Sequence, residues 1–498
     1  MKSSCLIGLD IGTSGAKAVV IDRDGRLLAW AGREYPLHTP RPGWAEEDPR
    51  DWVAAALVCI GEVVRQANID PRQVAAIGLA GQMHTLVCLD AHGEPLRPAI
   101  LWADQRSGDQ VRRLQERVGL DQLAQWTGNP LATGFMLASW AWLMENEPIV
   151  AESTRWLMLP KDYVRFVLTG ALGTEPGDAS ATLLFDPHIL AWCAPLLDVV
   201  GLSPERLPPV FSSAEVAGAL RADVAAACGL PAGIPVIFGS SDVSLQALAQ
   251  GVIVPGTVSC TIGTGGQLFA PLQAPRHDPQ LRLHLFCHAL SGIWHHEAAI
   301  LSAGLALRWL RDQVWPGSNF AGLADAATEV EGATDGLFFL PFLVGERTPY
   351  MEPGLRAGFL GLGLRHGKAH LVRAVMEGVV FELRQGLDLM LSLGTPVERL
   401  LATGGATRHP LWLQLQADIF NRPIHVSSVE EATARGAALL AGIGVGIYQD
   451  ARDAICQAVV EPEASVFPNP ERVELYASAY KTYRQWAETV VDRYRAGW

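Results

Sequence analysis

The stretch that decides the fold is residues 6–25, LIGLDIGTSGAKAVVIDRDG. Two apolar runs, over residues 6–12 and 16–22, predict a pair of strands joined by Thr13-Ser14-Gly15. Glycine allows backbone conformations that turn successive amides inward, and such amides form a nest that binds anions. The adjacent carboxylate of Asp10 is a type of ligand that magnesium accepts. The stretch therefore predicts either a phosphate-binding hairpin or an ordinary tight turn between two buried strands.

A second Gly-rich hairpin is predicted over residues 256–272, GTVSCTIGTGGQLFAPL. Its core at 262–266 repeats the Ile-Gly-Thr-x-Gly pattern of residues 11–15. Strands alternate with helices around both hairpins, which predicts an α/β fold. The repeat indicates an internal duplication, and we expect an N-terminal domain over 1–245 and a C-terminal domain over 246–498.

The composition narrows the class of protein. At 498 residues the chain is long enough for two or three domains, and a net charge of −13 argues against a nucleic-acid partner. The eight cysteines occur singly, without a CxxC pair, so we expect buried, reduced thiols in a cytoplasmic protein. The first residues lack the pattern of a signal peptide, and no apolar run approaches the length of a membrane span.

The familiar nucleotide-binding loops do not occur in the sequence. It contains no Gly-x-x-x-x-Gly-Lys-Ser/Thr loop and no Gly-x-Gly-x-x-Gly that opens a helix. Gly404-Gly405 instead follows an apolar strand and precedes a predicted helix. A backbone without side chains there would let an adenine ring or a phosphate approach closely. The alternative is a simple turn from strand to helix.

Several motifs occur in a fixed order along nearly the whole chain, and together they resemble the FGGY carbohydrate kinases. The resemblance implies two actin-like, ribonuclease H-like domains around a central cleft, with sugar bound mainly by the N-terminal domain and ATP mainly by the C-terminal domain. The motifs are GLDIGTSGAKAVVID (8–22), GLAGQMH (78–84), AILWADQR (99–106), LPKDY (159–163), GSSD (239–242), TIGTGG (261–266), FLPFLVGERTP (339–349) and LLATGGATRHPLWLQLQADIFNRPI (400–424).

The resemblance implies that Asp242 is the general base. A sugar hydroxyl is a poor nucleophile until a carboxylate within hydrogen-bond distance can take its proton. Read from the residues alone, Ser241 and Asp242 also suit the N-cap of a helix.

The same resemblance implies a sugar site on the N-terminal side. Met83 and His84 would contact the sugar, although a lone histidine is more often a surface or satisfied residue. Trp102 would offer an apolar face to the carbon skeleton, and Asp104 and Arg106 would bond either sugar hydroxyls or each other. The implied ATP-binding residues are Thr13, Ser14, Gly263, Thr264, Gly404 and Gly405, with Asp10 near Mg²⁺.

The expected reaction is ATP-dependent phosphorylation of a ketopentose, D-xylulose to D-xylulose 5-phosphate. One departure leaves the sugar open: Val243 follows the expected base, where members of the family commonly place Asn or Gln. The alternatives are another ketose, a polyol or a sugar acid such as gluconate, or a non-catalytic sugar sensor. The partners expected are a small sugar and ATP, with no nucleic acid and no membrane, and a homodimer is left open. The motif Gly345–Pro349 receives no chemical role from the sequence.

Overall fold

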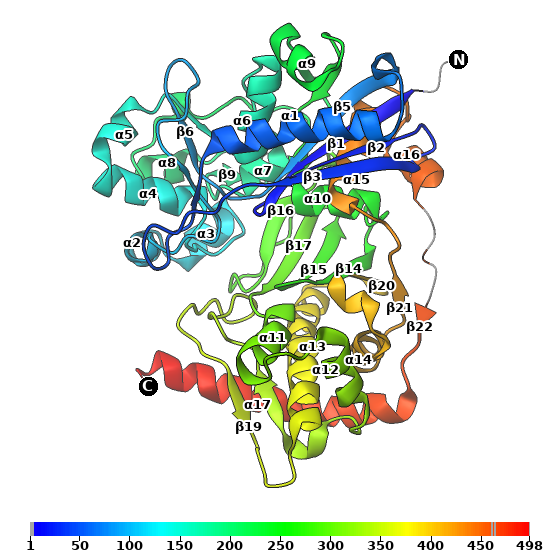
Figure 1. Cartoon of the computed structure of the whole chain (residues 1–498). Helices are drawn as coiled ribbons and strands as arrows, with labels where there is room; N and C mark the ends of the chain where they lie inside the picture. The colour runs from blue at the N-terminus through cyan, green and yellow to red at the C-terminus, as the bar shows by residue number, and fades with distance from the viewer. Residues whose placement is uncertain (1–3, 460–461, 463–464, 498) are drawn as a thin grey trace.

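The computed structural model describes residues 4–459, 462 and 465–497, and it contains two seven-stranded sheets with helices packed against them. The first sheet lies in the upper half of Figure 1 and the second lies below it. The predicted α/β class is confirmed. The strands of the first sheet are β1 (Cys5–Ile11), β2 (Gly15–Ile21), β3 (Leu27–Glu34), β5 (Val74–Gly81), β11 (Val216–Ala219), β12 (Pro235–Ile237) and β13 (Ser240–Ser241).

The second sheet repeats the pairing of the first. In one half β1 pairs antiparallel with β2 and parallel with β5, and in the other β14 pairs antiparallel with β15 and parallel with β20. The order β11-β12-β5-β1-β2-β3 matches β22-β21-β20-β14-β15-β17. The predicted duplication is therefore confirmed in the strand topology. The strands of the second sheet are β14 (Gly256–Ile262), β15 (Gly266–Leu272), β16 (His284–Cys287), β17 (Trp294–Ile300), β20 (Val397–Thr403), β21 (Ile424–Val426) and β22 (Ser465–Val466).

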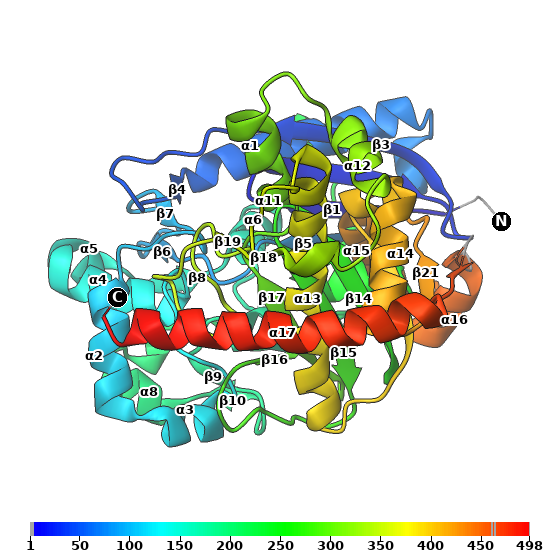
Figure 2. The same ribbon diagram turned by 90° about the horizontal axis from the view of Figure 1, so that it is seen from below.

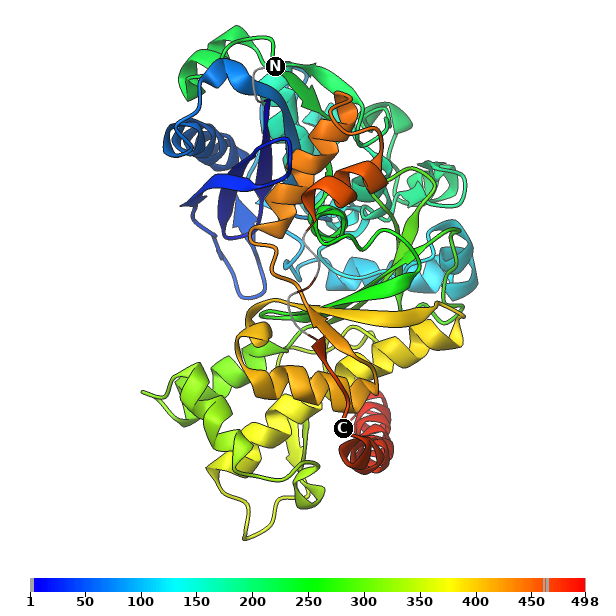
Figure 3. The same cartoon turned by 90° about the vertical axis from the view of Figure 1, so that its right-hand side faces the viewer.

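Helices cover both faces of the first sheet, and one of them comes from late in the chain. Helix α1 (Pro49–Gln66) packs on β2 and β3, and α15 (Ala432–Gly444) packs on β1 and β5. Figure 3 shows α15 beside the first strands. The backbones of α15 and β5 can approach closely because residue 78 is glycine: a Cβ there would lie 1.9 Å from the carbonyl oxygen of Ala437. The expected division at 245/246 lies within α10 (Asp242–Ala249) and stays a prediction.

The helices of the lower half pack on the second sheet. Helix α13 (Lys368–Ser392) lies against β15 and β17, and α17 (Pro470–Arg495) packs on α13 and on α14 (Pro410–Phe420). Figure 2 shows α17 crossing this side of the molecule. Two shorter helices, α11 (Gly304–Trp309) and α12 (Phe320–Thr328), stand near the β14–β15 turn.

The cysteines match the prediction with one exception. All eight are free and seven are buried, but Cys456 is exposed. Its helix, α16 (Ala451–Ala458), turns Ala454 and Ala458 inward, which leaves Cys456 on the outer face. Among the described residues, no helix is both long and apolar enough to cross a membrane.

Candidate active site

The ends of three parallel strands bring Asp10 and Asp242 to the same edge of the first sheet. In β1, Asp10 pairs with Ala80 of β5, and β13 pairs with β5 so that Ser240 also lies opposite Ala80. Asp242 then opens α10, directly after β13. Because strands of one direction end at one edge, the two carboxylates face a common space although 232 positions of sequence separate them.

The surroundings of these carboxylates favour their protonated forms. Burial raises the pKa of Asp242 to about 8, and the nearby charge of Asp10 adds to the shift. Burial likewise raises the pKa of Asp10 to about 6. Neighbouring like charges that have lost solvent shift pKa values in this direction, and such pairs are common in active sites.

Asp242 does not act as a helix cap. Ser241 occupies the N-cap position, and its hydroxyl makes no capping hydrogen bond. One oxygen of Asp242 accepts a hydrogen bond from the amide of Val243 at 2.9 Å, and the residue is only partly buried. The carboxylate is therefore accessible to a ligand rather than used up by the helix terminus.

Asp10 fits the role of a magnesium ligand. Its Oδ1 atom is buried and has no hydrogen-bond partner among the described residues. Within the same residues, no group of three or more His, Cys, Asp or Glu side chains could hold a metal ion. Magnesium in phosphate-transferring enzymes is commonly held by one or two carboxylates together with phosphates and water. A single orphaned carboxylate oxygen is consistent with such a shared site.

The second hairpin forms part of a pocket of about 440 Å³. Gly263, Thr264 and Gly405 line it together with apolar side chains of α11, α12 and α14. The carbonyls of Gly263 and Thr264 accept hydrogen bonds from the amides of Gly304 and Leu305, which fixes the turn against α11. The structure thus brings three of the six predicted ATP-binding residues into one cavity.

Gly404 lies beside this pocket and affects how closely two strand ends can pack. Its φ is +83°, and a Cβ there would lie 2.6 Å from the carbonyl oxygen of Ile262. In contrast, a Cβ on Gly405 would meet nothing within 4 Å. Gly404 therefore lets the ends of β20 and β14 lie close together, whereas Gly405 presents bare backbone to the pocket.

On the opposite side, the first hairpin is tied to the predicted sugar residues. The indole nitrogen of Trp102 donates to the hydroxyl of Thr13 at 2.8 Å, and that hydroxyl lies 3.2 Å from the side-chain oxygen of Gln82. Thr13 is partly buried and Ser14 is exposed. The hydroxyl of Thr13 is thus already engaged within the protein, so its backbone amide and that of Ser14 are the groups left to face a phosphate.

His84 is held in one orientation beside the loop that follows β5. Its Nδ1 donates to the carbonyl of Ala181 at 2.6 Å, and its ring lies 4.0 Å from that of Phe135. Burial lowers the pKa of His84 to about 3, so the ring is neutral and Nε2 is a hydrogen-bond acceptor. Its φ of +68° is rare outside glycine and marks a constrained loop. Met83, the preceding residue, is buried.

Asp104 and Arg106 bond to each other. Asp104 is 1% exposed, accepts a hydrogen bond from the amide of Ala45 and forms a paired contact with the guanidinium of Arg106. Arg106 also lies over the ring of Trp44, at 3.6 Å. Of the two alternatives open from the sequence, this geometry favours the internal ion pair over contact with a sugar.

Two charged residues of the second half complete the region, and the sequence did not single them out. Glu297 on β17 is buried and is close enough to raise the pKa of Asp242. The guanidinium of Arg347 lies 6.0 Å from the ring centres of both Trp102 and Phe135. For Arg347 the sequence did contain a signal, the motif Gly345–Pro349. That motif marked the segment as notable but did not show that its arginine faces the first half.

Known proteins resemble the chain over almost its full length. Sequence profiles of the FGGY family of carbohydrate kinases match residues 5–249 (N-terminal domain) and 258–445 (C-terminal domain). The xylulose kinase of Bacillus subtilis (strain 168) is 33% identical over 479 residues, or 96% of each chain. A xyloylose kinase from Brucella ovis has a TM-score of 0.91 at 35% identity, and a gluconate kinase from Lactobacillus acidophilus has 0.94 at 27%; both matches cover 98% of this chain and 99% of the other.

These matches agree with the fold and with the paired hairpins. They confirm two actin-like α/β domains around a central cleft and an ATP-dependent sugar kinase. The chain belongs to the FGGY family of carbohydrate kinases.

Proposed function

We propose that the protein phosphorylates a ketopentose, D-xylulose, on its terminal hydroxyl to give D-xylulose 5-phosphate, with Asp242 as the general base. The observation that carries the proposal is the partly exposed carboxylate of Asp242 beside Asp10, at the strand ends that face the second half. Relatives named xylulose kinase, at 33% identity, support the choice of sugar.

In this proposal the sugar binds near Met83 and His84, with its terminal hydroxyl at Asp242. Nε2 of His84 accepts a hydrogen bond from another hydroxyl. Asp242 takes the proton of the terminal hydroxyl as the oxygen attacks the γ-phosphorus in line. The bond from the γ-phosphorus to the β–γ bridging oxygen breaks, and ADP leaves. General-base assistance of this kind typically contributes ~10²–10⁴-fold, whereas the positioning of two bound reactants supplies roughly 7–11 kcal/mol. Most of the rate acceleration therefore comes from the arrangement of sugar and nucleotide.

The nucleotide lies across the two hairpins. Its adenosine occupies the pocket lined by Gly263, Thr264 and Gly405, and its phosphates meet the backbone amides of both turns. Asp10 would hold magnesium. The positive charge of the ion would offset the negative charge of the phosphates, and it would favour the ionised form of Asp242. Domain closure would exclude water, which would otherwise compete with the sugar for the phosphoryl group.

A second acceptor is favoured by specific observations. Val243 supplies no polar contact next to Asp242, and the gluconate kinase neighbour matches the backbone with a TM-score of 0.94. A sugar acid, another ketose or a polyol would use the same base and nucleotide site.

A panel of acceptors decides among these substrates. ADP release is measured with D-xylulose, D-ribulose, xylitol and gluconate, and each phosphorylated product is identified by mass spectrometry. We expect the highest kcat/KM with D-xylulose. A higher value with gluconate or a polyol would overturn the choice of sugar but not the phosphotransfer. ATP hydrolysis without any phosphosugar would instead favour a sensor.

A further inference from the structure

Arg347 is a cation of the second half that lies against predicted sugar residues of the first half. It belongs to the loop after β18 (Phe338–Leu340), in the second half of the chain. Its guanidinium stands 6.0 Å from the ring centres of Trp102 and Phe135, which belong to the first half. Within the part of the chain that the structure describes, its side chain makes no hydrogen bond and no ion pair within 4 Å. Five donors are therefore available to a ligand.

The loop does not need this side chain to hold its shape. One oxygen of Glu346 accepts from the amides of Leu301 (2.9 Å) and Arg347 (2.8 Å), and the amide of Thr348 donates to the carbonyl of Ala299 at 3.0 Å. These bonds fasten the loop to the end of β17. The side chain that lies between these two anchors is thus directed by the backbone.

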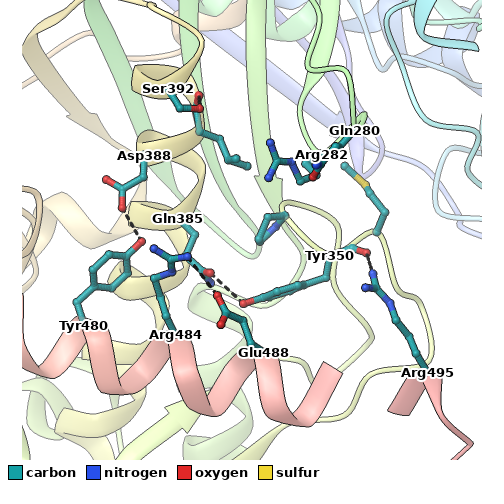
Figure 4. Close-up of a pocket in the computed structure, with 13 residues that line it drawn as sticks. Gln280, Arg282, Tyr350, Gln385, Asp388, Ser392, Tyr480, Arg484, Glu488 and Arg495 are labelled. Carbon is teal, nitrogen blue, oxygen red and sulfur yellow. Dashed lines mark hydrogen bonds and ion pairs between the residues drawn. The ribbon is translucent and has the colours of Figure 1, made fainter. Parts of the chain in front are cut away.

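Further contacts fasten the loop from behind. The hydroxyl of Tyr350 donates to the side-chain oxygen of Gln385 at 2.9 Å, and Arg495 donates to the carbonyl of Tyr350 at 2.8 Å (Figure 4). They line a separate pocket of about 550 Å³ between α13 and α17, which contains none of the predicted site residues. Because other contacts hold the loop on both sides, the side chain of Arg347 is not needed for the fold of the loop and can bind a ligand.

The groups around Arg347 define the ligand chemistry. His84 offers an acceptor nitrogen and suits a hydroxyl donor, whereas a guanidinium offers donors only. Phe135 links Arg347 to His84: the guanidinium lies 6.0 Å from the centre of the Phe135 ring, and the ring of His84 lies 4.0 Å from that same ring. The negative charges of Glu297 and Glu346 act to raise the pKa of Arg347, but burial lowers it more. A guanidinium bonds best to an sp² oxygen that carries negative or partial negative charge.

We propose that Arg347 contacts the substrate and holds an sp² oxygen of the acceptor, either the carbonyl of a ketose or the carboxylate of a sugar acid. This inference rests on the proposed sugar kinase activity and assigns to the second half a part of the sugar site. Asp242 would act on the terminal hydroxyl while Arg347 binds an oxygen on another carbon. The acceptor is then bound by both domains, and the motif Gly345–Pro349 gains a chemical role.

The test compares a ketose with the alditol that lacks its carbonyl. The KM for D-xylulose and the inhibition constant of xylitol are measured for the wild type, Arg347→Met and Arg347→Lys. In Arg347→Met we expect the KM for D-xylulose to rise about 10–100-fold, the usual effect of losing a hydrogen bond to a charged group, with little change for xylitol. Arg347→Lys keeps the charge but not the paired donors, so an intermediate change is expected.

A control variant and a second acceptor distinguish the possible outcomes. Arg365→Met removes an exposed arginine that pairs with Asp335 and should change neither constant. If gluconate is the better wild-type substrate and Arg347→Met abolishes that preference, the sp² oxygen is a carboxylate, and the proposal stands. Equal losses for D-xylulose and xylitol, or a lower kcat with unchanged discrimination, would overturn it, because Arg347 would then act on the phosphoryl group or on the fold. A wild type inactive on every acceptor would refute the proposed function instead. If Arg347→Met does not fold, the lysine variant alone decides by the same ratio.

Discussion

The β1–β2 and β14–β15 hairpins have the same Ile-Gly-Thr turn, but the residue before the turn differs. In the first hairpin it is Asp10, opposite Ala80 on the parallel neighbour strand. In the second it is Thr261, opposite Thr403, and their hydroxyls lie 2.9 Å apart. Gln246, one turn after Asp242 on α10, lies within 3.4 Å of both threonine hydroxyls. One backbone frame thus carries carboxylates in one half and neutral hydroxyls in the other.

This difference separates two chemical tasks. The half with Asp10 and Asp242 carries carboxylates, which can bind a metal ion and accept a proton. In the proposed function, the half with Thr261 would offer backbone amides and a pocket to a polyanionic nucleotide, which a carboxylate would repel. The duplication therefore supplies the shape, and single substitutions supply the chemistry.

The largest effect is expected at the base. Asp242→Asn keeps the shape but cannot accept the proton, so kcat should fall ~10²–10⁴-fold while the KM for ATP stays unchanged. Steady-state kinetics with the best acceptor measure both. Asp109→Asn, on an exposed side chain of α2 (Gly108–Val118), is the control and should behave as the wild type. Near-normal turnover of Asp242→Asn would remove Asp242 from the catalytic step.

The next effect tests the two equivalent positions against each other. Asp10→Asn should raise the magnesium concentration needed for half-maximal activity at least about 10–100-fold, the range typical of losing a residue from the outer shell of a metal site. Thr261→Val, at the matching place of the second hairpin, should leave that concentration unchanged. A magnesium titration at saturating ATP measures both variants. If they shift alike, the charge difference between the hairpins has no functional meaning.

A smaller effect is expected at the glycine pair of the nucleotide half. Gly404→Ala forces a Cβ to within 2.6 Å of the Ile262 carbonyl at a positive φ, so the free energy of unfolding should fall by more than about 1 kcal/mol. Gly405→Ala meets nothing within 4 Å and should leave the Tm unchanged. Its KM for ATP should rise about fivefold, equivalent to about 1 kcal/mol, if the nucleotide lies on this backbone. An unchanged KM would place adenosine elsewhere.

Much of the fold could be predicted from local patterns. The two hairpins, the strand before Gly404 and the helix that follows Gly405 all follow from apolar periodicity and glycine positions. The duplication was visible because its turn repeats five residues with little change. The position of α15 on the first sheet could not be predicted, because no local pattern shows which sheet a helix of small residues will pack against.

The side-chain partners were the least predictable part of the site. Thr13 bonds to Gln82 and Trp102, which lie 69 and 89 positions away. Arg347 reaches residues of the other domain. Sequence patterns report the period of an element and the chemistry of a residue, but these contacts depend on how two domains pack. The prediction was therefore best for residues at strand ends, whose place the sheet itself determines.

The smallest expected effect concerns the stability of the ligand-free protein. The native pKa of Asp242 is about 8, against an ordinary value of 3.8. The native state therefore binds this proton more tightly than the unfolded chain, and the resulting stability is present at low pH and lost as the pH rises through about 8. Asn does not titrate. The Tm of Asp242→Asn should therefore rise relative to that of the wild type between pH 5 and pH 9, by a few degrees at about 1 °C per kcal/mol for a chain of this length. Thermal melts in a chelator, without nucleotide, measure the difference. Thr261→Val should show the same offset from the wild type at both pH values, because no charge is buried at its position. Parallel curves for wild type and Asp242→Asn would mean that the ionised carboxylate of Asp242 does not destabilise the first half.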